Sequence, residues 1–517
     1  MGAGVWAALQ VAALLPLLLA LWWHLVWRPR AVARSFARQG IRGAPYTFLV
    51  GSMLKTKRLV VAGRTGAAPM DAGNHDIVPV VLRPLHTWTA EYGRTFLFWF
   101  GPIPAICSTD LELIKEVLTD RTGMFQKDYL IPVLKFLIGN GVILTNGDEW
   151  KRHRKLVLPA FNHEKLKSMS EVTTRVTEQM IQAWRTQIQQ SSGHRAAEID
   201  MTNAFSQVTE EVIGRLAFGT SHRKSREVIV AAMREMQKIA TVAFRDPPIL
   251  WYLPTRGNLR VRRLDRVLRT EIMAMVQERV AAAKDGGAYG DDLVGILLEQ
   301  RGSGETLTAD EVIDECKTFF AAGQETTATL LVWAMFLLAV HPQWQDRVRE
   351  EVLREFRGGD GEAPNADVLG QLKLLHMVLI ETSRLYPPIV YIQRRAAMDV
   401  VLGGIKVPQG TVISIPIAML HRDKEVWGPD ADEFNPMRFE HGATKAAKDP
   451  KALLSFSLGP RACIGQSFGV MEAQIVMASL LSNFSFSLSP KYVHKPRYAI
   501  SLAPKLGMPL IVKKLNE

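Results

Sequence analysis

The chain has 517 residues, of which 47% are hydrophobic and 22% charged, and 63 Lys plus Arg against 51 Asp plus Glu give it a formal net charge of +12. These values are typical of a globular protein and exclude both a mostly disordered chain and a polytopic membrane protein. The length is sufficient for one large domain with a deep buried pocket. Three widely spaced cysteines exclude a disulfide framework and a C-x-x-C zinc site, and they indicate a reducing compartment.

The positive charge is concentrated at the start of the chain. Residues 1–70 contain nine Lys or Arg and no Asp or Glu, so the rest is close to neutral. A nucleic-acid-binding protein would carry Lys and Arg on its folded domain, and we therefore expect no nucleic-acid partner.

An uncharged, apolar segment opens the sequence. Residues 5–27 carry no formal charge, and about 20 apolar residues in a helix suffice to cross a bilayer. Trp22, Trp23 and Trp27 are typical of a membrane interface, and arginines follow from Arg28 onward. The segment lacks the basic start and short apolar core of a signal peptide. We predict a retained transmembrane anchor at 5–27, a basic linker or hinge at 28–51 and a cytosolic domain at 52–517.

Two long helices are expected after the middle of the chain. Apolar residues at helical spacing predict one over 258–284, whose arginines are expected to be solvated. The second begins with a capping box, Thr308-Ala309-Asp310-Glu311, and stops at His341-Pro342. At 1.5 Å per residue it would be about 48 Å long, enough to cross a domain, so it must be central.

The middle of this central helix is polar although both of its ends are apolar. Its sequence there is Gly323-Gln324-Glu325-Thr326-Thr327. One interpretation is a hydroxyl bonded back to the preceding turn, with Glu325 reaching solvent. The other is a helix locally opened over a bound group, because buried polar groups need partners or a purpose.

A further helix is predicted over 367–386, ending at Pro387-Pro388, with Glu381 and Arg384 three residues apart as an ion pair. Short strand-like runs follow, among them residues 410–415. The predicted architecture is mainly α with a smaller β portion.

A cysteine loop precedes the last long helix, which is expected to run to about Leu481. The loop is Phe456-Ser457-Leu458-Gly459-Pro460-Arg461-Ala462-Cys463-Ile464-Gly465. A thiolate before a helix N-terminus is stabilised by free backbone N–H groups and can bind a metal or act as a nucleophile. A lone cysteine is more often structural. Here Arg461 offers a cation for an anionic group, and Gly465 permits close approach of something flat.

This loop resembles the haem-binding loop of the cytochrome P-450 monooxygenases. Four other motifs occur in that family's order, namely Trp150-x-x-x-Arg154, Ala322-Gly323-Gln324-Glu325-Thr326, Glu381-x-x-Arg384 and Phe434-Asn435-Pro436-Met437-Arg438-Phe439. The resemblance covers essentially the whole chain. It implies the cytochrome P-450 fold and haem b, iron protoporphyrin IX, with Cys463 as the axial thiolate that favours O–O cleavage.

The resemblance also implies roles for single residues. It places Trp150, Arg154, Arg461 and Arg394 on the haem propionates, with Arg395 an adjacent alternative to Arg394. Phe456 would shield the sulfur, and Gly465 would belong to the cofactor-binding residues. It makes Glu381, Arg384 and Arg438 a structural salt-bridge network, and Glu325 with Thr326 the catalytic pair that delivers protons during O2 activation. Three departures from the family pattern are Gln324 in the central helix, Ser383 in place of a common leucine, and Pro45 as the only proline of residues 40–51, where a proline-rich hinge is common.

Electrons must come from another protein, because neither a G-x-G-x-x-G nor a Walker-type loop occurs. The resemblance implies NADPH–cytochrome P-450 reductase as the partner and an endoplasmic reticulum location, single-pass, with the catalytic domain facing the cytosol. Lys151, Arg152 and Lys155 could contact the reductase electrostatically or could simply be solvated.

Within the family, the stretches around His75-Asp76-Ile77-Val78-Pro79 and His421-Arg422-Asp423 resemble the plant clan numbered seventy-two, nearest its group containing subterminal and in-chain fatty-acid hydroxylases. Sister groups oxidise gibberellins, brassinosteroids, cytokinins and triterpenoids, so a lipophilic substrate is expected without its identity. The candidate pocket residues by family position are Tyr129, Val133, Phe320, Ile389, Val390, Tyr391 and Ile500. Two other classes stay open: a haem-binding carrier or sensor, which would not need Glu325 and Thr326, and a cysteine-nucleophile hydrolase.

Overall fold

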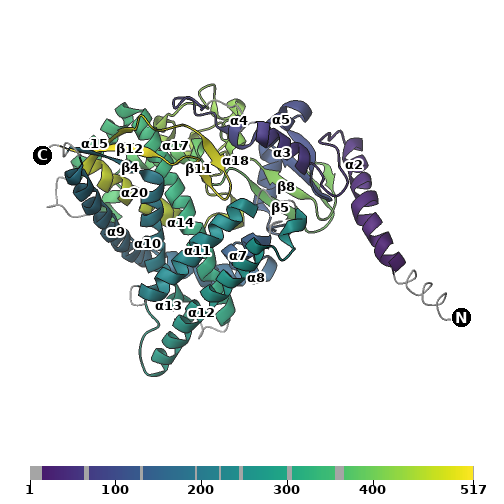
Figure 1. Cartoon of the computed structure of the whole chain (residues 1–517). Coiled ribbons are helices and arrows are strands. Elements are labelled where there is room, and N and C mark those ends of the chain that lie inside the picture. Colours follow the sequence, from purple (N-terminus) through teal and green to yellow (C-terminus); the bar gives the residue numbers. More distant parts are fainter. Residues whose placement is uncertain are drawn as a thin grey trace. The chain divides into compact units, whose positions relative to one another are not determined.

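The computed structural model describes residues 14–62, 69–128, 132–191, 195–219, 223–243, 248–299, 306–355 and 366–515. The chain divides into two compact units, and Figure 1 labels helices and strands of both. The first unit comprises Met1–Ala68, Val78–Asp128 and Tyr391–Leu420, and the second comprises Pro69–Ile77, Tyr129–Val390 and His421–Glu517.

A five-stranded sheet organises the first unit, in the order β1-β2-β8-β5-β3. Strand β2 pairs with β8 in parallel, and the other pairs are antiparallel. The strands of this sheet are β1 (Thr95–Phe100), β2 (Ile103–Ser108), β3 (Phe125–Gln126), β5 (Ile392–Ala396) and β8 (Val412–Ile415). Strand β8 falls within the predicted run 410–415, where Gly410 supplies the positive φ of 81° that the preceding turn requires. A separate hairpin joins β6 (Val400–Leu402) to β7 (Ile405–Val407).

The first unit also contains the beginning of the chain. Residues 14–22 are helical and are followed by η1 (Trp23–Trp27) and α2 (Arg28–Arg38). Val32 and Phe36 of α2 are buried, and Gly43 and Gly51 form bridges to β1. A Cβ at Gly43 would lie 1.9 Å from the Leu97 carbonyl oxygen, so only glycine allows this approach. The other helices of this unit are α3 (Met53–Ala62), α4 (Val78–Val81), α5 (Arg83–Tyr92), α6 (Leu111–Thr119) and α18 (Ile417–Leu420).

The second unit is mainly helical and is centred on α14 (Ala309–Val340), which packs against α10, α17 and α20. Its shorter elements are η2 (Leu158–Phe161), η3 (Pro248–Trp251), α16 (Ala366–Leu369), α19 (Lys424–Trp427), η5 (Pro436–Phe439), η6 (Ala443–Lys445) and η7 (Gly459–Arg461). The remaining helices are α7 (Pro132–Ile138), α8 (Gly147–Val157), α9 (His163–Gln190), α10 (Met201–Phe218), α11 (Arg223–Ala243), α12 (Arg256–Lys284), α13 (Leu293–Glu299), α15 (Pro342–Glu355), α17 (Lys373–Leu385) and α20 (Gln466–Asn483).

Two small sheets complete the second unit. One has the strand order β4-β12-β9, and the other is the hairpin β10-β11. Their strands are β4 (Ala196–Asp200), β9 (Phe484–Leu488), β10 (Pro496–Tyr498), β11 (Leu502–Pro504) and β12 (Pro509–Lys514). The chain is therefore mainly α with a smaller β portion, as predicted.

Helix α14 begins as the sequence predicts. The Thr308 side chain accepts a hydrogen bond from the Glu311 backbone N–H, and the Glu311 carboxylate accepts one from the Thr308 N–H. Among the described residues, α14 is also the one helix long and apolar enough to cross a membrane. Because 72% of its most apolar window is buried within the protein, it has the character of a core helix.

The prediction of one helix over 367–386 was wrong. The structure has two helices, α16 and α17, separated by a turn at residues 370–372. The Glu351 carboxylate accepts hydrogen bonds from the N–H groups of Leu374 and Leu375, at 2.8 and 2.9 Å. A side chain from another helix thus satisfies the free donors that a new helix start creates, which no local sequence signal announces.

Candidate active site

The polar middle of α14 is the first part of the candidate site. Phe319, Ala322, Gly323 and Thr326 keep part of their surface exposed in a helix that is otherwise largely buried. These positions are spaced three and four apart, so they form one face of α14. On another face, Gln324 is buried, donates to the Ser206 hydroxyl of α10 and accepts from the Gln237 amide of α11, both at 3.0 Å. The departure at Gln324 therefore ties α14 to two neighbouring helices.

The catalytic pair predicted by resemblance lies on this stretch. The Thr326 hydroxyl donates to the Ala322 carbonyl oxygen at 2.6 Å, which is the bond to the preceding turn that the simpler interpretation expected. The second half of that interpretation agrees in part, because Glu325 keeps some exposed surface while its carboxylate is bonded within the protein. Its carboxylate accepts a hydrogen bond from Ser501 at 2.6 Å. Burial raises the pKa of Glu325, and the bond from Ser501 acts in the opposite direction.

The cysteine loop presents its thiol outward. Cys463 is exposed, and its backbone N–H bonds to the Phe456 carbonyl oxygen at 2.9 Å. Two left-handed residues shape the turn, Ser457 with a φ of 63° and Gly459 with a φ of 69°. Helix α20 then begins at Gln466, so the sulfur lies just before a helix N-terminus, as predicted.

Two arginines and a tryptophan form a cationic rim beside this loop, which we define as Trp150, Arg154 and Arg461. The guanidinium groups of Arg461 and Arg154 lie 4.2 and 5.8 Å from the Trp150 ring centroid. Arg154 also donates to the Ala462 carbonyl oxygen at 3.3 Å, next to Cys463. Burial lowers the pKa of Arg154, and the negative charge of Cys463 partly opposes this.

Elements far apart in sequence hold the rim in place. Arg461 donates to the carbonyl oxygen of Thr145 and to the side chain of Asn146, at 2.6 and 3.0 Å, just before α8. A Cβ added at Gly465 would lie 3.5 Å from the Phe161 ring. An exposed thiol, two cations and a small residue after the sulfur fit haem b, whose two propionates are anionic.

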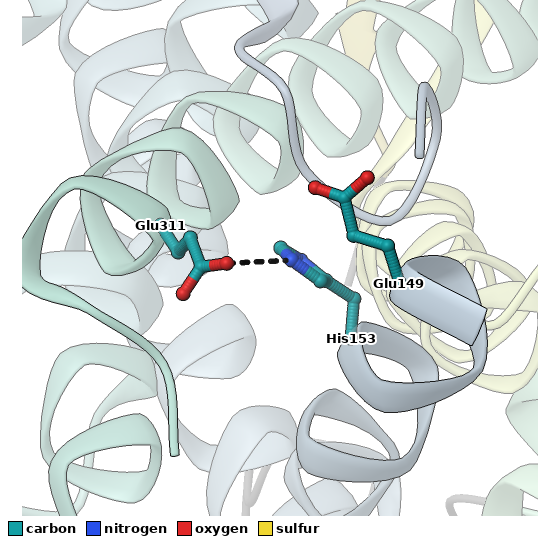
Figure 2. Close-up of side chains that lie close together, drawn as sticks. All are labelled: Glu149, His153 and Glu311. Carbon is teal, nitrogen blue, oxygen red and sulfur yellow. Dashed lines mark ion pairs between the residues drawn. The ribbon is translucent and has the colours of Figure 1, made fainter. Parts of the chain in front are cut away.

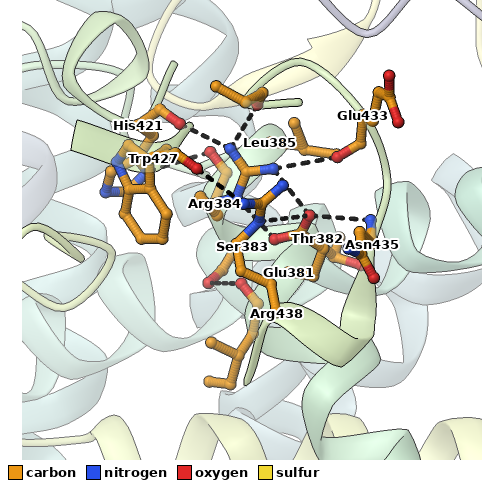
Figure 3. Close-up of polar contacts among 12 residues, drawn as sticks. Glu381, Thr382, Ser383, Arg384, Leu385, His421, Trp427, Glu433, Asn435 and Arg438 are labelled. Atoms are coloured by element: carbon orange, nitrogen blue, oxygen red, sulfur yellow. Dashed lines mark hydrogen bonds and ion pairs between the residues drawn. The ribbon is translucent and has the colours of Figure 1, made fainter. Parts of the chain in front are cut away.

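A buried salt-bridge network is centred on Glu381 and Arg384 (Figure 3). Arg384 and Glu381 are both fully buried and form a bidentate pair at 2.6 and 2.7 Å. Arg384 also donates to the carbonyl oxygens of His421, Ala431 and Glu433. Arg438 lies 3.7 Å from Glu381 and binds Asp430 at 2.7 Å. The three residues predicted for this network are thus brought together.

Two members of the network were not predicted as site residues. His421 lies 3.1 Å from the Arg384 carbonyl oxygen through Nδ1 and accepts from the Leu454 N–H through Nε2 at 2.8 Å. Because a carbonyl can only accept and an N–H only donate, the ring is neutral with its proton on Nδ1. Burial and the nearby Arg384 charge lower the pKa of His421 to about 3. Ser383 donates to the Ser455 hydroxyl at 2.9 Å, so this departure from the family pattern ties α17 to the cysteine loop.

A second ionic cluster joins α8 to α14 (Figure 2). Glu149, His153 and Glu311 lie close enough to hold a metal ion. However, Arg152 already binds both carboxylate oxygens of Glu311, and His153 bonds to the buried Glu315 at 2.6 Å. Burial lowers the pKa of His153, but Glu315 outweighs this effect and the net shift is upward. The cluster is therefore a set of ion pairs that fixes α8, the helix that carries Trp150 and Arg154.

This cluster bears on the residues proposed for reductase contact. Arg152 is engaged with Glu311 and the Thr306 carbonyl oxygen. Lys151 pairs only with Asp148 of its own helix, at 2.8 Å, and is 66% exposed, and Lys155 is exposed. Lys151 and Lys155 thus lie at the surface, where they could contact a reductase, whereas the Arg152 side chain is bonded within the protein.

The remaining predicted residues are distributed over both units. In the second unit, Val133, Phe320 and Val390 are buried, whereas Ile389 and Ile500 are partly exposed. Tyr391 and Arg394 belong to the first unit, and Tyr129 lies outside the described residues. Arg394 is 4% exposed and bonds to the Gln393 carbonyl oxygen, whereas its alternative Arg395 forms an ion pair with Asp128.

Comparison with known proteins identifies the family of this chain. The cytochrome P450 family model matches residues 82–510, and the chain belongs to this family. Its members are monooxygenases that bind haem b through an axial cysteine thiolate and take electrons from a reductase, so the family assignment supports Cys463 as a metal ligand rather than a nucleophile.

Three similar curated proteins come from plants, which confirms the resemblance to plant members. Cytochrome P450 709B1 of Arabidopsis thaliana is 37% identical over 501 residues, 95% of each chain. Cytochrome P450 734A6 of Oryza sativa subsp. japonica is 39% identical over 504 residues, 95% of this chain and 92% of the relative. The 11-oxo-beta-amyrin 30-oxidase of Glycyrrhiza uralensis is 36% identical over 522 residues, 99% of this chain and 98% of the relative.

Proposed function

We propose that this monooxygenase is anchored in the endoplasmic reticulum membrane by residues 5–27, faces the cytosol and hydroxylates a lipophilic substrate with electrons from NADPH–cytochrome P-450 reductase. The main support for this proposal is that one compact unit contains the exposed Cys463, the cationic rim and the pair Glu325 and Thr326. A carrier or sensor would have no need of that pair.

The described part of the anchor supports the membrane location. Residues 14–22 are helical, and Leu14, Leu18 and Trp22 are 53%, 59% and 52% exposed. A continuous apolar surface of this kind is unfavourable in water and stable in lipid. Trp23 and Trp27, which stack at 4.1 Å, would lie at the interface, and the arginines of α2 would lie on the cytosolic side.

Each residue of the site has a proposed task. Cys463 would ligate the iron, and the arginines of the cationic rim would neutralise the propionates. Bound haem supplies the redox chemistry that activates O2. Glu325 and Thr326 would deliver protons from a helix that is otherwise largely buried, which would limit proton entry to this stretch.

Two substrate classes are proposed, in order. The first is in-chain or subterminal hydroxylation of a fatty acid, supported by the nearest family resemblance and by apolar pocket candidates without a cation among them. The second is a terpenoid or plant hormone, favoured by the similarity to an 11-oxo-beta-amyrin 30-oxidase. In both cases the recognition would depend mainly on apolar contact.

The test uses the full chain, reductase and NADPH in lipid vesicles, with panels of fatty acids, triterpenoids and hormones. Addition of one oxygen atom to a panel member, absent in Cys463→Ser, is the expected result. Haem-loaded protein that binds these compounds without oxidising any of them would support the carrier instead. Alkaline extraction of cell membranes tests the anchor: the full chain should stay with the lipid, and a variant without residues 1–27 should be released more readily.

A further inference from the structure

Ser501 occupies a fixed position in the turn between β10 and β11. It is 3% exposed. The next residue, Leu502, donates its N–H to the Pro388 carbonyl oxygen at 3.0 Å and accepts at its own carbonyl from the Trp333 indole of α14 at 2.7 Å. The two bonds of Leu502, one of them to α14, therefore hold the neighbouring Ser501 backbone in place.

The Ser501 hydroxyl has two partners, and both lie on α14. It donates to Glu325 Oε1 at 2.6 Å and accepts from the Thr329 hydroxyl at 3.1 Å. Glu325 and Thr329 are four residues apart, so they share one helix face. A hydroxyl has a single proton, and the bond from Thr329 leaves that proton available for Glu325. The three groups form a directed chain from Thr329 through Ser501 to Glu325.

Few other charged groups face Glu325. The carboxylate of Glu210 on α10 and the guanidinium of Arg497 on β10 act on it electrostatically, and Glu210 is itself ion-paired with Arg234 of α11. Burial favours the neutral form of Glu325, and a donated hydrogen bond favours the ionised form. The hydrogen bond from Ser501 lowers the pKa of Glu325 and so opposes burial in part, while the net shift stays upward.

We propose that Ser501 is a positioning residue for O2 activation: its hydroxyl, oriented by Thr329, holds the Glu325 carboxyl group in the orientation from which it delivers protons. The proposal rests on the proton-delivery role of Glu325 given above. Productive turnover converts substrate, O2, NADPH and one proton into hydroxylated product, water and NADP⁺. Without ordered proton delivery, the same O2, NADPH and proton yield hydrogen peroxide and NADP⁺, so the loss appears as uncoupling.

The first test reads the contact itself in the haem-containing full chain, without substrate or reductase. The infrared carbonyl band of protonated Glu325, assigned by its loss in Glu325→Gln, is titrated with pH. In Ser501→Ala the midpoint should move upward, because the donor to the ionised carboxylate is gone. In Ser501→Thr, which keeps a hydroxyl, it should stay near that of the unmodified protein. An unchanged midpoint in Ser501→Ala would overturn the proposal.

The second test measures the fraction of NADPH recovered as product. We expect about a tenfold loss in Ser501→Ala, with hydrogen peroxide rising in proportion, and most of the coupling restored by Ser501→Thr. The matched control is Ser170→Ala, which removes another buried serine hydroxyl whose bond, 2.6 Å to the Lys167 carbonyl oxygen, lies within α9.

The two tests separate the possible failures. If the titration midpoint of Glu325 moves but the coupling of NADPH to product stays unchanged, Glu325 does not deliver the protons. The functional part of the proposal would then be overturned. Thr329→Val gives an independent check if Ser501→Ala folds poorly, because it leaves Ser501 in place but removes its orienting donor. In Thr329→Val the titration midpoint of Glu325 should also move upward. An unchanged midpoint in both variants would contradict the chain of hydroxyl groups from Thr329 through Ser501 to Glu325.

Discussion

Two buried carboxylates of this protein lie in very different surroundings. Glu381 meets Arg384 in a bidentate pair and also accepts from the Asn435 N–H at 3.0 Å. Glu325 is held by one serine hydroxyl, on a helix face that stays partly exposed. The Glu381 network is saturated with donors and fixes the backbone behind the cysteine loop. Glu325 accepts from Ser501, and burial raises its pKa, which suits the proton delivery proposed above.

The difference agrees with a structural role for Glu381 and with the proton delivery proposed for Glu325. A buried ion pair is stable only when further hydrogen bonds satisfy its remaining atoms, and Arg384 donates such bonds to three backbone carbonyl oxygens. A group that transfers protons must instead be able to exist in both protonation states. Substitutions in the Glu381 network should therefore lower folding stability, whereas substitutions near Glu325 should lower the yield of product per NADPH.

The largest effect should follow from Arg384→Ala. It leaves Glu381 as an uncompensated buried charge, which costs about 3–5 kcal/mol of folding free energy. We expect little folded, haem-loaded protein, measured by denaturant unfolding and by haem content. The matched control is Arg260→Ala, which breaks an exposed pair with Glu235 and should change little. Equal losses in the two variants would contradict the structural role of the network.

Thr326→Val should separate chemistry from stability. Its hydroxyl bonds within α14, so we expect a nearly unchanged melting temperature but about a hundredfold loss of product per NADPH. Thr177→Val is the control, since that buried threonine makes the same type of bond to Thr173 in α9, at 2.8 Å. Full coupling in Thr326→Val would remove Thr326 from the proton route.

The pH dependence of stability should report on the neutral histidine of the network. The pKa of His421 is about 3 when folded and near 6.5 when unfolded, so between these values the unfolded chain binds more protons. Stability should therefore fall as the pH is lowered from about 6.5 toward 3, with His421 contributing about 1.4 kcal/mol per pH unit. His75 and His494, with pKa values lowered mainly by burial to about 3 and 4, add to the slope.

The contribution of His421 can be isolated by substitution. His421→Asn should be less stable at neutral pH and should show a shallower loss of unfolding free energy below pH 6.5. His441→Gln, at an exposed position, should leave the slope as it is. An identical slope in His421→Asn would show that His421 is already charged in the folded protein.

The smallest effect should come from Ser383→Ala, which removes the hydroxyl bond to Ser455. A hydrogen bond of this kind contributes about 1 kcal/mol. Haem release at elevated temperature should be slightly faster than in the unmodified protein, with unchanged coupling of NADPH to product. A loss of coupling would extend the functional region into the network.

The sequence predicts features that short segments determine by themselves. The capping box at Thr308 and the pairing of Glu381 with Arg384 lie within one helical turn, and both are confirmed. The motifs also indicate which residues gather around Cys463, because their family order is distinctive. Helix boundaries that depend on a distant side chain were missed, as the Glu351 carboxylate at the start of α17 shows.

The contacts that tune the site are the least accessible to sequence. Ser501 lies 176 residues from Glu325, and nothing in the turn after β10 indicates which carboxylate it meets. His421 is 33 residues from Leu454, and its role depends on two backbone groups that a sequence pattern does not encode. Such contacts follow from the packing of α14, α17 and the cysteine loop in the folded chain.

The most direct measurement is the difference spectrum of the reduced protein with and without carbon monoxide, taken in membranes beside Cys463→Ser. A red-shifted Soret band that disappears in Cys463→Ser is the expected result, because only a thiolate ligand produces that shift. The same red-shifted band in Cys463→Ser, or no haem band in folded and haem-supplied protein, would contradict the assignment of Cys463 as the axial ligand.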